Sequence, residues 1–507
     1  MRTKLTLLFA VLALFHSSIW GNNLTISNMY LRGQNDAEGY KMIKMDVRWD
    51  NSWRTSTYES NHDAVWIFAK YRLLWQEGVW NHATISSTGH TLPSGAAVSV
   101  PSDGKGAFLY RDADGSGSVN FSDLQLRWNY TADGLNNTDS VEICVFGIEM
   151  VYIPQGNFFV GDGNSSSLGR FVSGTTTDTS FEITSEDAIT IGNSSTSELW
   201  GTSTTGYSTI GDPGTLPAAF PKGYASFYVM KYEITQGQYR DFLNKLTRNQ
   251  QGNRSLGITG LGNFINNATI PTYRNGIRLA SEPGGSLPRV FDCDLNNNGV
   301  GNESDDGEHI ACNYLSAFDL LAYLDWAGLR PMTELEFEKT CRGTRPHFPD
   351  EKAWGNTNVV AATGIQNSGA SNEAPTNPTI TNVNYGNAAA VQGPLRSGCF
   401  AGATTTREQA GATYYGVMEM SGNCWEYVVV VSTATGKGYT GKHGDGVLSD
   451  TGERNETNWP NRLGLKGGTW GSITLNAINI SDRANTGGDY STQRYNSTGG
   501  RGVRTAP

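Results

Sequence analysis

The residues best suited to hold a hard metal ion lie in one short stretch, residues 414–427, which read YYGVMEMSGNCWEY. Two carboxylates, Glu419 and Glu426, lie on either side of the pair Gly422 and Asn423, within a run of large apolar side chains. This pattern favours a buried turn over a plain strand. Calcium prefers the carbonyl and carboxylate oxygens that such a turn brings together. The stretch therefore predicts either a calcium site or a core turn whose two glutamates form salt bridges.

A second set of oxygen-bearing side chains has the spacing of an EF-hand-type calcium loop. Residues 112–123 read DADGSGSVNFSD, with Gly117 at loop position 6. Positions 1, 3, 5, 7, 9 and 12 are held by Asp112, Asp114, Ser116, Ser118, Asn120 and Asp123. The flanking segments 108–110 and 124–128 are typical of strands and not of helices. A calcium loop and a glycine-rich β-turn with solvated acids are both open here.

The elements that must position these residues begin after a predicted export signal. Residues 1–21 combine Arg2 and Lys4 with an unbroken apolar run over residues 5–15, the pattern of a secretory signal peptide. No second apolar segment has the length of a membrane span. We therefore expect a secreted or cell-surface protein, extracellular or periplasmic, in a setting that permits disulfides.

One pair of cysteines, Cys293 and Cys312, brackets an acidic, asparagine-rich loop. A disulfide between them would lower the entropy of the unfolded chain, which is worth roughly 3 kcal/mol of stability. Asp294, Asn296 and Asn298 offer oxygens to a cation, but a solvated loop is the expectation here. Two other cysteines, Cys144 and Cys341, either pair or stay buried as thiols.

A chain of 507 residues predicts two domains. Short segments rich in aromatic and β-branched residues, such as 44–49 and 64–71, recur between turn-forming clusters over residues 22–147. Regular short strands of this kind predict an antiparallel β-sandwich. The fold class expected for the whole chain is α+β, with this sandwich followed by a second domain over residues 148–507.

The second domain is expected to contain few helices and many loops. Three capping boxes, each a Thr or Ser followed three residues later by Gln, Asp or Glu, predict helix starts at Thr235, Ser316 and Thr333. Residues 161–219 are dominated by Gly, Ser and Thr and contain few apolar anchors. This insertion predicts either a flexible excursion or an exposed β-arm.

The charge of the chain excludes one class of partner. The formal net charge is −10, the pI is near 5.3 and no basic run occurs. Nucleic acid needs basic patches that neutralise its phosphates, so a nucleic-acid-binding function is not expected.

The stretch 414–427 resembles the signature of formylglycine-generating enzymes, also called the sulfatase-modifying-factor domain. Further blocks follow the order of that family from about residue 149 to the C-terminus. They are MVYIPQG (150–156), LRPMTELEFE (329–338), GGTW (467–470) and GGRGVR (499–504). The resemblance implies a C-type-lectin-like fold. The resemblance is a specific indication of the fold and a much weaker indication of the activity.

The resemblance also implies site residues. It carries calcium to the side chains of Glu419 and Glu426 and to the backbone carbonyls of Gly422 and Cys424. The family usually has an apolar residue at position 424, so the cysteine there is a departure. A disulfide between Cys399 and Cys424 is the pairing this departure suggests.

Members of the family oxidise a substrate cysteine with copper held by two cysteines shortly after the glycine pair. In this chain Ser472 and Ala477 stand where those thiolates are expected, and no cysteine follows Cys424. Hydroxyl and methyl groups do not hold Cu(I), so copper is not expected. An iron site would have to combine His443 and Asp445 with a distant residue such as His347.

Two functions of different class follow. The first is an exported, non-catalytic protein, stabilised by calcium, that binds or assembles at a cell surface; its partners would be other copies, a surface glycan or an exported protein. The second is a formylglycine-generating-type or non-haem metal oxidoreductase that modifies exported proteins. The missing thiolates favour the first.

Overall fold

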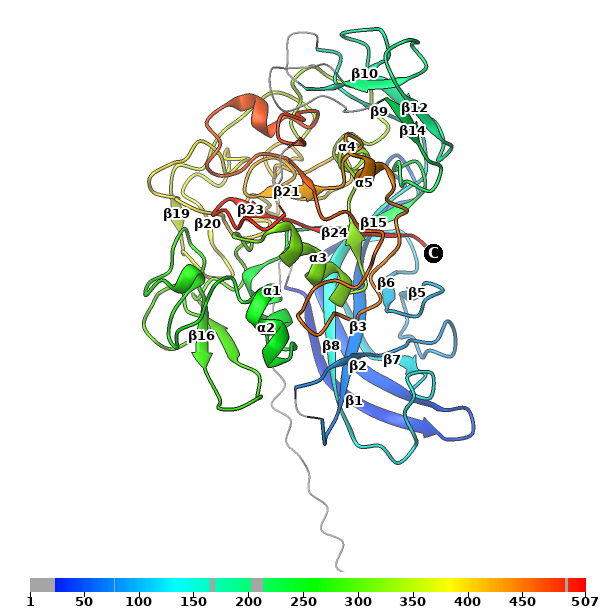
Figure 1. Ribbon diagram of the computed structural model, residues 1–507, viewed down its shortest axis with the longest axis vertical. Coiled ribbons are helices and arrows are strands. Elements are labelled where there is room, and N and C mark those ends of the chain that lie inside the picture. The colour runs from blue at the N-terminus through cyan, green and yellow to red at the C-terminus, as the bar shows by residue number, and fades with distance from the viewer. Residues whose placement is uncertain (1–22, 77, 165–168, 202–212, 488–490) are drawn as a thin grey trace, which may run out of the picture.

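The computed structural model describes residues 23–76, 78–164, 169–201, 213–487 and 491–507 (Figure 1). The predicted signal peptide, residues 1–21, lies outside these ranges. Within them, no helix has both the length and the apolar character needed to cross a membrane.

The N-terminal part is an antiparallel β-sandwich, as predicted. One sheet has the order β1-β2-β7, and the facing strands belong to a larger sheet that includes β3, β5 and β6. The bounds are β1 (Thr25–Asn35), β2 (Tyr40–Arg54), β3 (Asp63–Leu73), β4 (Asn81–His82), β5 (Ala96–Ser99), β6 (Ala107–Arg111) and β7 (Gly115–Trp128). Alternate residues of β2, namely Ile43, Met45, Val47 and Trp49, are fully buried between the sheets. This alternation selects the face of β2 that turns inward.

The two parts of the chain share one sheet. The strand β8 (Val141–Ile153) pairs with β3 on one side and with β15 (Phe227–Met230) on the other. The eight-stranded sheet runs β18-β24-β15-β8-β3-β6-β5, with β4 beside β3, β18 at Arg330–Pro331 and β24 at Gly502–Thr505. The boundary predicted at residue 147 therefore falls inside a strand, where the hydrophobic pattern continues without a break.

The described residues of the insertion, 161–164, 169–201 and 213–219, form a small β-structure that packs on the second part, at the end of the molecule where Figure 1 labels β10 and β12. Its strands and their neighbour β9 are β9 (Phe158–Val160), β10 (Phe171–Ser173), β11 (Phe181–Ile183), β12 (Ile189–Ile191), β13 (Leu199–Gly201) and β14 (Gly214–Leu216). Phe171, Leu199 and Leu216 are fully buried and belong to the main core. These few anchors hold the described part of the insertion in place.

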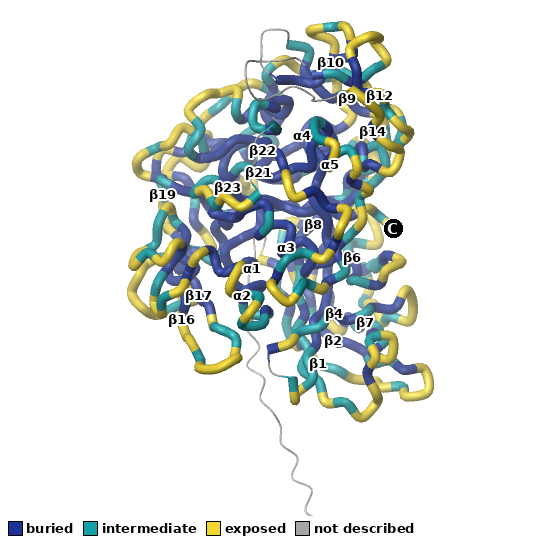
Figure 2. The backbone as a smooth tube through the Cα atoms, in the orientation of Figure 1, coloured by how far each residue is buried: buried dark blue, intermediate teal, exposed yellow. Residues whose placement is uncertain are grey.

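The three predicted helices are confirmed, each with its capping box. They are α1 (Gln236–Leu243), α3 (Ala317–Trp326) and α4 (Glu334–Arg342), capped by Thr235, Ser316 and Thr333. The shorter helices α2 (Arg248–Arg254) and α5 (Ala434–Lys437) were not predicted. The remaining elements are η1 (Ile265–Asn267), β16 (Ile277–Ser281), β17 (Val290–Cys293), β19 (Ile365–Gln366), β20 (Ala374–Pro375), β21 (Trp425–Val428), β22 (Gly464–Lys466), η2 (Leu475–Ile478) and β23 (Thr498–Gly499). Figure 2 shows the buried backbone concentrated along the sheets and helices, with exposed loops around them.

The predicted disulfides are wrong, because all six cysteines are free. Cys399 packs in a small apolar cluster with Leu395 and Phe400, whereas Cys424 belongs to the buried signature turn. The thiol of Cys312 donates to the backbone carbonyl of Asn313 at 3.6 Å. Closeness in sequence to a loop does not orient two Cβ atoms for a disulfide.

We expect the two parts to unfold together, because the fully buried Trp66 of β3 donates its indole N–H to the carbonyl of Ala327, just after α3, at 2.9 Å. Trp66→Ala should lower the free energy of unfolding by about 3–5 kcal/mol. Calorimetry should show one transition that shifts as a whole. The control Trp75→Ala, at a residue 73% exposed, should change stability by less than about 0.5 kcal/mol. Two transitions, of which only one moves, would contradict this expectation.

Candidate functional site

The signature turn is built around a buried ion pair between Glu426 and Arg501. The guanidinium donates to both carboxylate oxygens, at 2.7 and 2.8 Å, and neither side chain is more than 1% exposed. The same guanidinium donates to the carbonyls of Met230 and Lys231 at 3.1 Å and of Met418 at 2.8 Å. One arginine thus connects β21, the end of β15 and the segment before β24. Planar, bidentate pairing of this kind is the strong form of such contacts.

A second buried glutamate, Glu233, holds the turn from the other side. Its carboxylate accepts hydrogen bonds from the backbone N–H of Cys424, at 2.9 Å, and from the amide of Asn423. Burial and the charge of Glu426 raise the pKa of Glu233 well above its ordinary value. Asn423 has a φ of 62°, a left-handed conformation that asparagine tolerates. Its side-chain oxygen accepts from Leu395 N–H at 2.8 Å.

The third glutamate, Glu419, is only partly satisfied. Its Oε1 accepts from Gly398 N–H at 2.8 Å, whereas Oε2 is buried and has no hydrogen-bond partner among the described residues. Burial raises the pKa of Glu419 to about 7. Of the predicted calcium ligands, Glu426 directs both oxygens to Arg501, and Gly422 donates its N–H to Gly467 O at 2.8 Å. Of the two salt bridges expected for a core turn, only that of Glu426 with Arg501 is formed among the described residues. Calcium at this turn stays a prediction.

The structure places the ligands predicted in residues 112–123 along a turn and a strand and does not gather them at one point, so calcium there stays a prediction that this geometry does not favour. Asp112 and Asp114 lie in the turn before β7, where Asp114 accepts from Ser56 N–H and hydroxyl at 3.0 and 2.6 Å. Four others, Ser116, Ser118, Asn120 and Asp123, lie along β7 itself. An extended strand rises about 3.3 Å per residue, so these four are spread along it and do not surround a point. Pairing with β2 overrides the spacing.

A pocket of about 510 Å³ opens beside the signature turn. We call it the Trp470 pocket; its lining residues are Tyr273, Asn387, Gln392, Trp425, residues 469–473, Asn496 and Ser497. The rings of Tyr273 and Trp470 lie 5.4 Å apart, inclined at 33°. The carbonyl of Asn423 accepts from the N–H of Trp470, at 2.9 Å, and from the hydroxyl of Thr469, at 3.0 Å. The signature turn therefore holds the wall of the pocket directly.

The residues present at this pocket do not fit copper. Ser472 uses its hydroxyl oxygen to accept from Thr469 N–H at 3.1 Å, and Ala477 lies in η2. The cysteine next to the pocket in sequence, Cys424, is fully buried, and burial raises the pKa of its thiol well above the ordinary value. Cu(I) binds deprotonated thiolate sulfur, which a raised thiol pKa disfavours.

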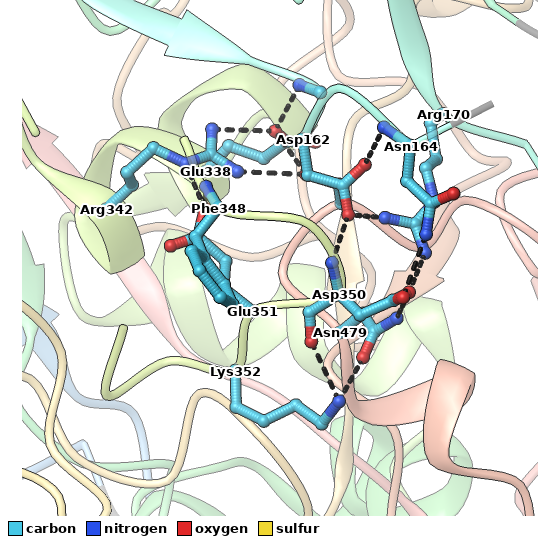
Figure 3. Close-up of polar contacts among 12 residues, drawn as sticks. Asp162, Asn164, Arg170, Glu338, Arg342, Phe348, Asp350, Glu351, Lys352 and Asn479 are labelled. Carbon is cyan, nitrogen blue, oxygen red and sulfur yellow. Dashed lines mark hydrogen bonds and ion pairs between the residues drawn. The ribbon is translucent and has the colours of Figure 1, made fainter. Parts of the chain in front are cut away.

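A buried polar network fixes the segment after the pocket (Figure 3). Asp350 accepts from Arg170 at 2.7 Å, from Asn479 at 3.0 Å and from Asn164 at 2.8 Å. Lys352 donates to the backbone carbonyl of Asp350 at 2.8 Å and to the side-chain oxygen of Asn479. Asn479 directly follows η2, so this network holds the segment containing Ser472 and Ala477 against the insertion.

The same network extends to α4. Glu338 is fully buried, pairs with Lys466 at 3.2 Å and accepts from Ser481 at 3.1 Å. Arg342 pairs with Glu338 and with Glu351. Desolvation disfavours the charge on Glu338, but Lys466 and Arg342 outweigh it and lower the pKa. Buried ion pairs therefore hold the helix predicted from the block 329–338 in place.

The residues considered for iron do not meet. His443 accepts from Thr505 N–H at 3.0 Å, beside β24. His347 forms a hydrogen bond with the hydroxyl of Ser180 at 2.8 Å, in the insertion. Asp445 accepts from Val447 N–H at 2.8 Å. None of these three belongs to a cluster of metal-binding geometry within the described residues.

The described residues contain one group of acidic side chains spaced closely enough to hold a metal ion: Glu303, Asp305 and Asp306, with ligand atoms within 4.8 Å of one another. Burial, together with the neighbouring carboxylates of Asp294, Asp305 and Glu303, raises the pKa of Asp306 to about 6. The sequence reasoning missed these three residues, because it treated the loop between Cys293 and Cys312 as solvated.

Comparison with known proteins identifies the family of the chain. Residues 147–506 match the family model FGE-sulfatase, described as the Sulfatase-modifying factor enzyme 1-like domain. Because the match covers more than half of the chain, the protein belongs to this family, and the resemblance found in the sequence is confirmed. A search of curated proteins finds no match.

We expect Glu419 to make stability depend on pH in calcium-free buffer. Its pKa is raised from 4.5 to about 7 in the folded protein, so the folded state binds more protons than the unfolded state between these values and stability falls as the pH rises through them. At about pH 8, Glu419→Gln should raise the free energy of unfolding by up to about 3 kcal/mol, and near pH 4.5 it should change little.

Denaturant unfolding in EDTA at the two pH values measures this effect. The control Glu38→Gln replaces an exposed glutamate and should show no such pH dependence. A Glu419→Gln variant that is less stable than the wild type at about pH 8 in EDTA would contradict the expectation.

Proposed function

We propose that the protein is an exported, non-catalytic member of its family that binds a neutral carbohydrate, a surface glycan, in the Trp470 pocket. The observation that carries this proposal is the lining of the pocket. It combines three aromatic rings with amide and hydroxyl groups, and none of its lining residues is charged, a histidine or a cysteine.

Tyr273 supplies an exposed aromatic ring, and the ring of Trp470 beside it is only 4% exposed. The indole N–H of Trp470 donates to the carbonyl of Asn496 at 3.1 Å, which holds this ring, and Tyr273 beside it is 42% exposed. At the rim, Ile473 is 77% exposed. Aromatic residues with an apolar face and a polar edge suit a ligand that has both C–H faces and hydroxyl groups.

The polar groups favour an uncharged ligand. The lining includes the amides of Asn387 and Gln392, which are hydrogen-bonded to each other at 3.0 Å, and the hydroxyl of Ser497. Amides and hydroxyls both donate and accept, as sugar hydroxyls require. A phosphate or a strongly charged peptide would meet no counter-charge among the lining residues.

The non-catalytic part of the proposal is supported by the donor set. Ser472 and Ala477 replace the expected thiolates, and the iron candidates lie apart. A formylglycine-generating-type or non-haem metal oxidoreductase would need ligands that the pocket does not provide. Stabilisation by calcium belongs to the same proposal, as does location at a cell surface, which the predicted signal peptide supports.

The test is binding of a panel of neutral oligosaccharides, such as cello-, manno- and chito-oligosaccharides, followed by titration calorimetry with the best binder. Tyr273→Ala should weaken binding by about 10-fold or more, because stacking on an aromatic ring is worth about 1–3 kcal/mol. Tyr58→Ala, at a residue 93% exposed and outside the pocket, should bind as the wild type does.

Two outcomes would overturn the glycan proposal. The first is that no oligosaccharide binds the wild type while an exported protein or a second copy does. The second is that oligosaccharides bind equally well to wild type and to Tyr273→Ala. The first result would change the class of ligand, and the second would place the oligosaccharide site outside the Trp470 pocket.

A further inference from the structure

The loop after β17 has a spacing that the function proposed above does not use. Residues 294–305 read DLNNNGVGNESD, so Asp294, Asn296 and Asn298 stand at positions 1, 3 and 5, Gly299 at position 6 and Asp305 at position 12. This is the spacing of an EF-hand-type loop with aspartate in the last position. Gly299 has a φ of +88°, the left-handed backbone that the sharp turn at this position requires. We call residues 294–306 the 294 loop.

Unlike the segment 112–123, the 294 loop folds back on itself. The carboxylates of Glu303, Asp305 and Asp306 each place an oxygen within 4.8 Å of the others. The loop returns to its start through Leu295 N–H, which donates to the carbonyl of Asp306 at 3.3 Å. The acidic groups are therefore gathered at one point, where like charges repel.

One carboxylate oxygen of Asp306 lacks a hydrogen-bond partner in the described part of the chain. The residue is fully buried, and its Oδ2 accepts from Glu303 N–H at 2.7 Å, but its Oδ1 is buried and has no hydrogen-bond partner among the described residues. A carboxylate oxygen removed from water without a partner costs about 1–3 kcal/mol or more. A bound cation is the simplest group that would satisfy it.

Two asparagine side chains stand between these carboxylates. Asn296 donates its amide to Asp305 at 3.1 Å, and Asn298 donates to Glu303 at 2.6 Å. Rotating each side-chain amide by 180° would place its oxygen where its nitrogen now lies, facing an ion held by the same carboxylates. The rotation fits because the oxygen and nitrogen ends of an amide have nearly the same shape. The loop can thus supply two neutral oxygens besides its acids.

The local charge is strongly unbalanced. Residues 292–306 contain five acids, Asp292, Asp294, Glu303, Asp305 and Asp306, and no basic residue. Arg278 of β16 pairs with Asp292 at 2.6 Å and with Asp294. Its single charge thus lies with those two carboxylates. For Glu303, Asp305 and Asp306, the donors described above are only asparagine amides and backbone N–H groups.

We propose that the 294 loop binds a calcium ion through the carboxylates of Glu303, Asp305 and Asp306 and the side-chain oxygens of Asn296 and Asn298. Five protein oxygens on a flexible loop suit calcium, which takes six to eight oxygen ligands, whereas magnesium usually keeps several waters and needs stricter geometry. This site is separate from the one that family resemblance assigns to Glu419 and Glu426. Its first-position residue, Asp294, is paired with Arg278 and stabilises the loop from outside the ion.

Calcium in the 294 loop would connect three neighbouring parts of the fold. Asp294 N–H donates to the carbonyl of Gly276 at 2.8 Å, and Gly307 N–H donates to the carbonyl of Gly369 at 3.0 Å. Glu308, two residues after Asp306, pairs with Arg240 of α1. The ion would thus rigidify the junction between the β16–β17 hairpin, α1 and the segment around Gly369.

The test is calorimetric titration of the full chain with calcium chloride after removal of divalent ions with EDTA and dialysis. The wild type should bind calcium with a dissociation constant in the range of about 10⁻⁵ to 10⁻³ M. Asp305→Asn and Asp306→Asn should each weaken binding at this site by about 10-fold or more. The matched control Asp112→Asn/Asp114→Asn should leave it unchanged, since those residues do not converge. Glu419→Gln separates the two sites, because it should not alter the ion bound by the 294 loop.

Thermal melts distinguish loss of the ligand from loss of the fold. Asparagine at position 306 keeps an oxygen for Glu303 N–H and removes an unpartnered acid, so Asp306→Asn should melt no lower than the wild type in EDTA. In calcium the wild type should gain stability and the variant should gain much less. The inference is overturned if the wild type binds no calcium, if both loop variants bind as it does, or if magnesium occupies the site equally well.

Discussion

The structure depends on one buried arginine placed among three glutamates. Arg501 satisfies Glu426 in full and also donates to three backbone carbonyls, while Glu233 and Glu419 lie close enough to feel the same charge. Taking such groups out of water is costly, and removing one partner of a buried pair typically costs about 3–5 kcal/mol. The arrangement is stable because nearly every hydrogen-bond donor and acceptor in it has a partner. It joins the signature turn, the end of β15 and the closing segment of the chain.

This constraint also positions the pocket beside the signature turn. The turn held by Arg501 and Glu233 presents the carbonyl of Asn423 to Thr469 and Trp470, and the network around Asp350 and Glu338 holds the segment that follows. Neither contact set requires a metal or a disulfide at the pocket. Ser472, whose hydroxyl accepts from Thr469 N–H, lies between these two supports. The glycan binding proposed above would use the pocket that they hold.

Features set by neighbouring residues were predicted correctly from the sequence, whereas features set by contacts between distant segments were not. Capping boxes at Thr235, Ser316 and Thr333 act within one helical turn, so they fixed the three helix starts. The end of the sandwich was placed at residue 147, but β8 continues through it because both halves of that strand pair with neighbours distant in sequence. The spacing of an EF-hand-type loop occurs twice, and pairing with the strand β2 makes residues 115–123 extended. The carboxylates of the signature turn were found, whereas Arg501 and Glu233, distant in sequence, gave no local sign of their pairing.

The central proposal is that the pocket beside the signature turn does not hold copper and carries out no copper-dependent oxidation. The most direct measurement combines copper analysis of the reduced protein, after loading with Cu(I) and dialysis, with mass spectrometry of a cysteine-containing peptide incubated with that sample in air. The account predicts that copper is lost on dialysis and that the peptide keeps its cysteine. One retained copper per chain, together with conversion of the cysteine to an aldehyde, would contradict it.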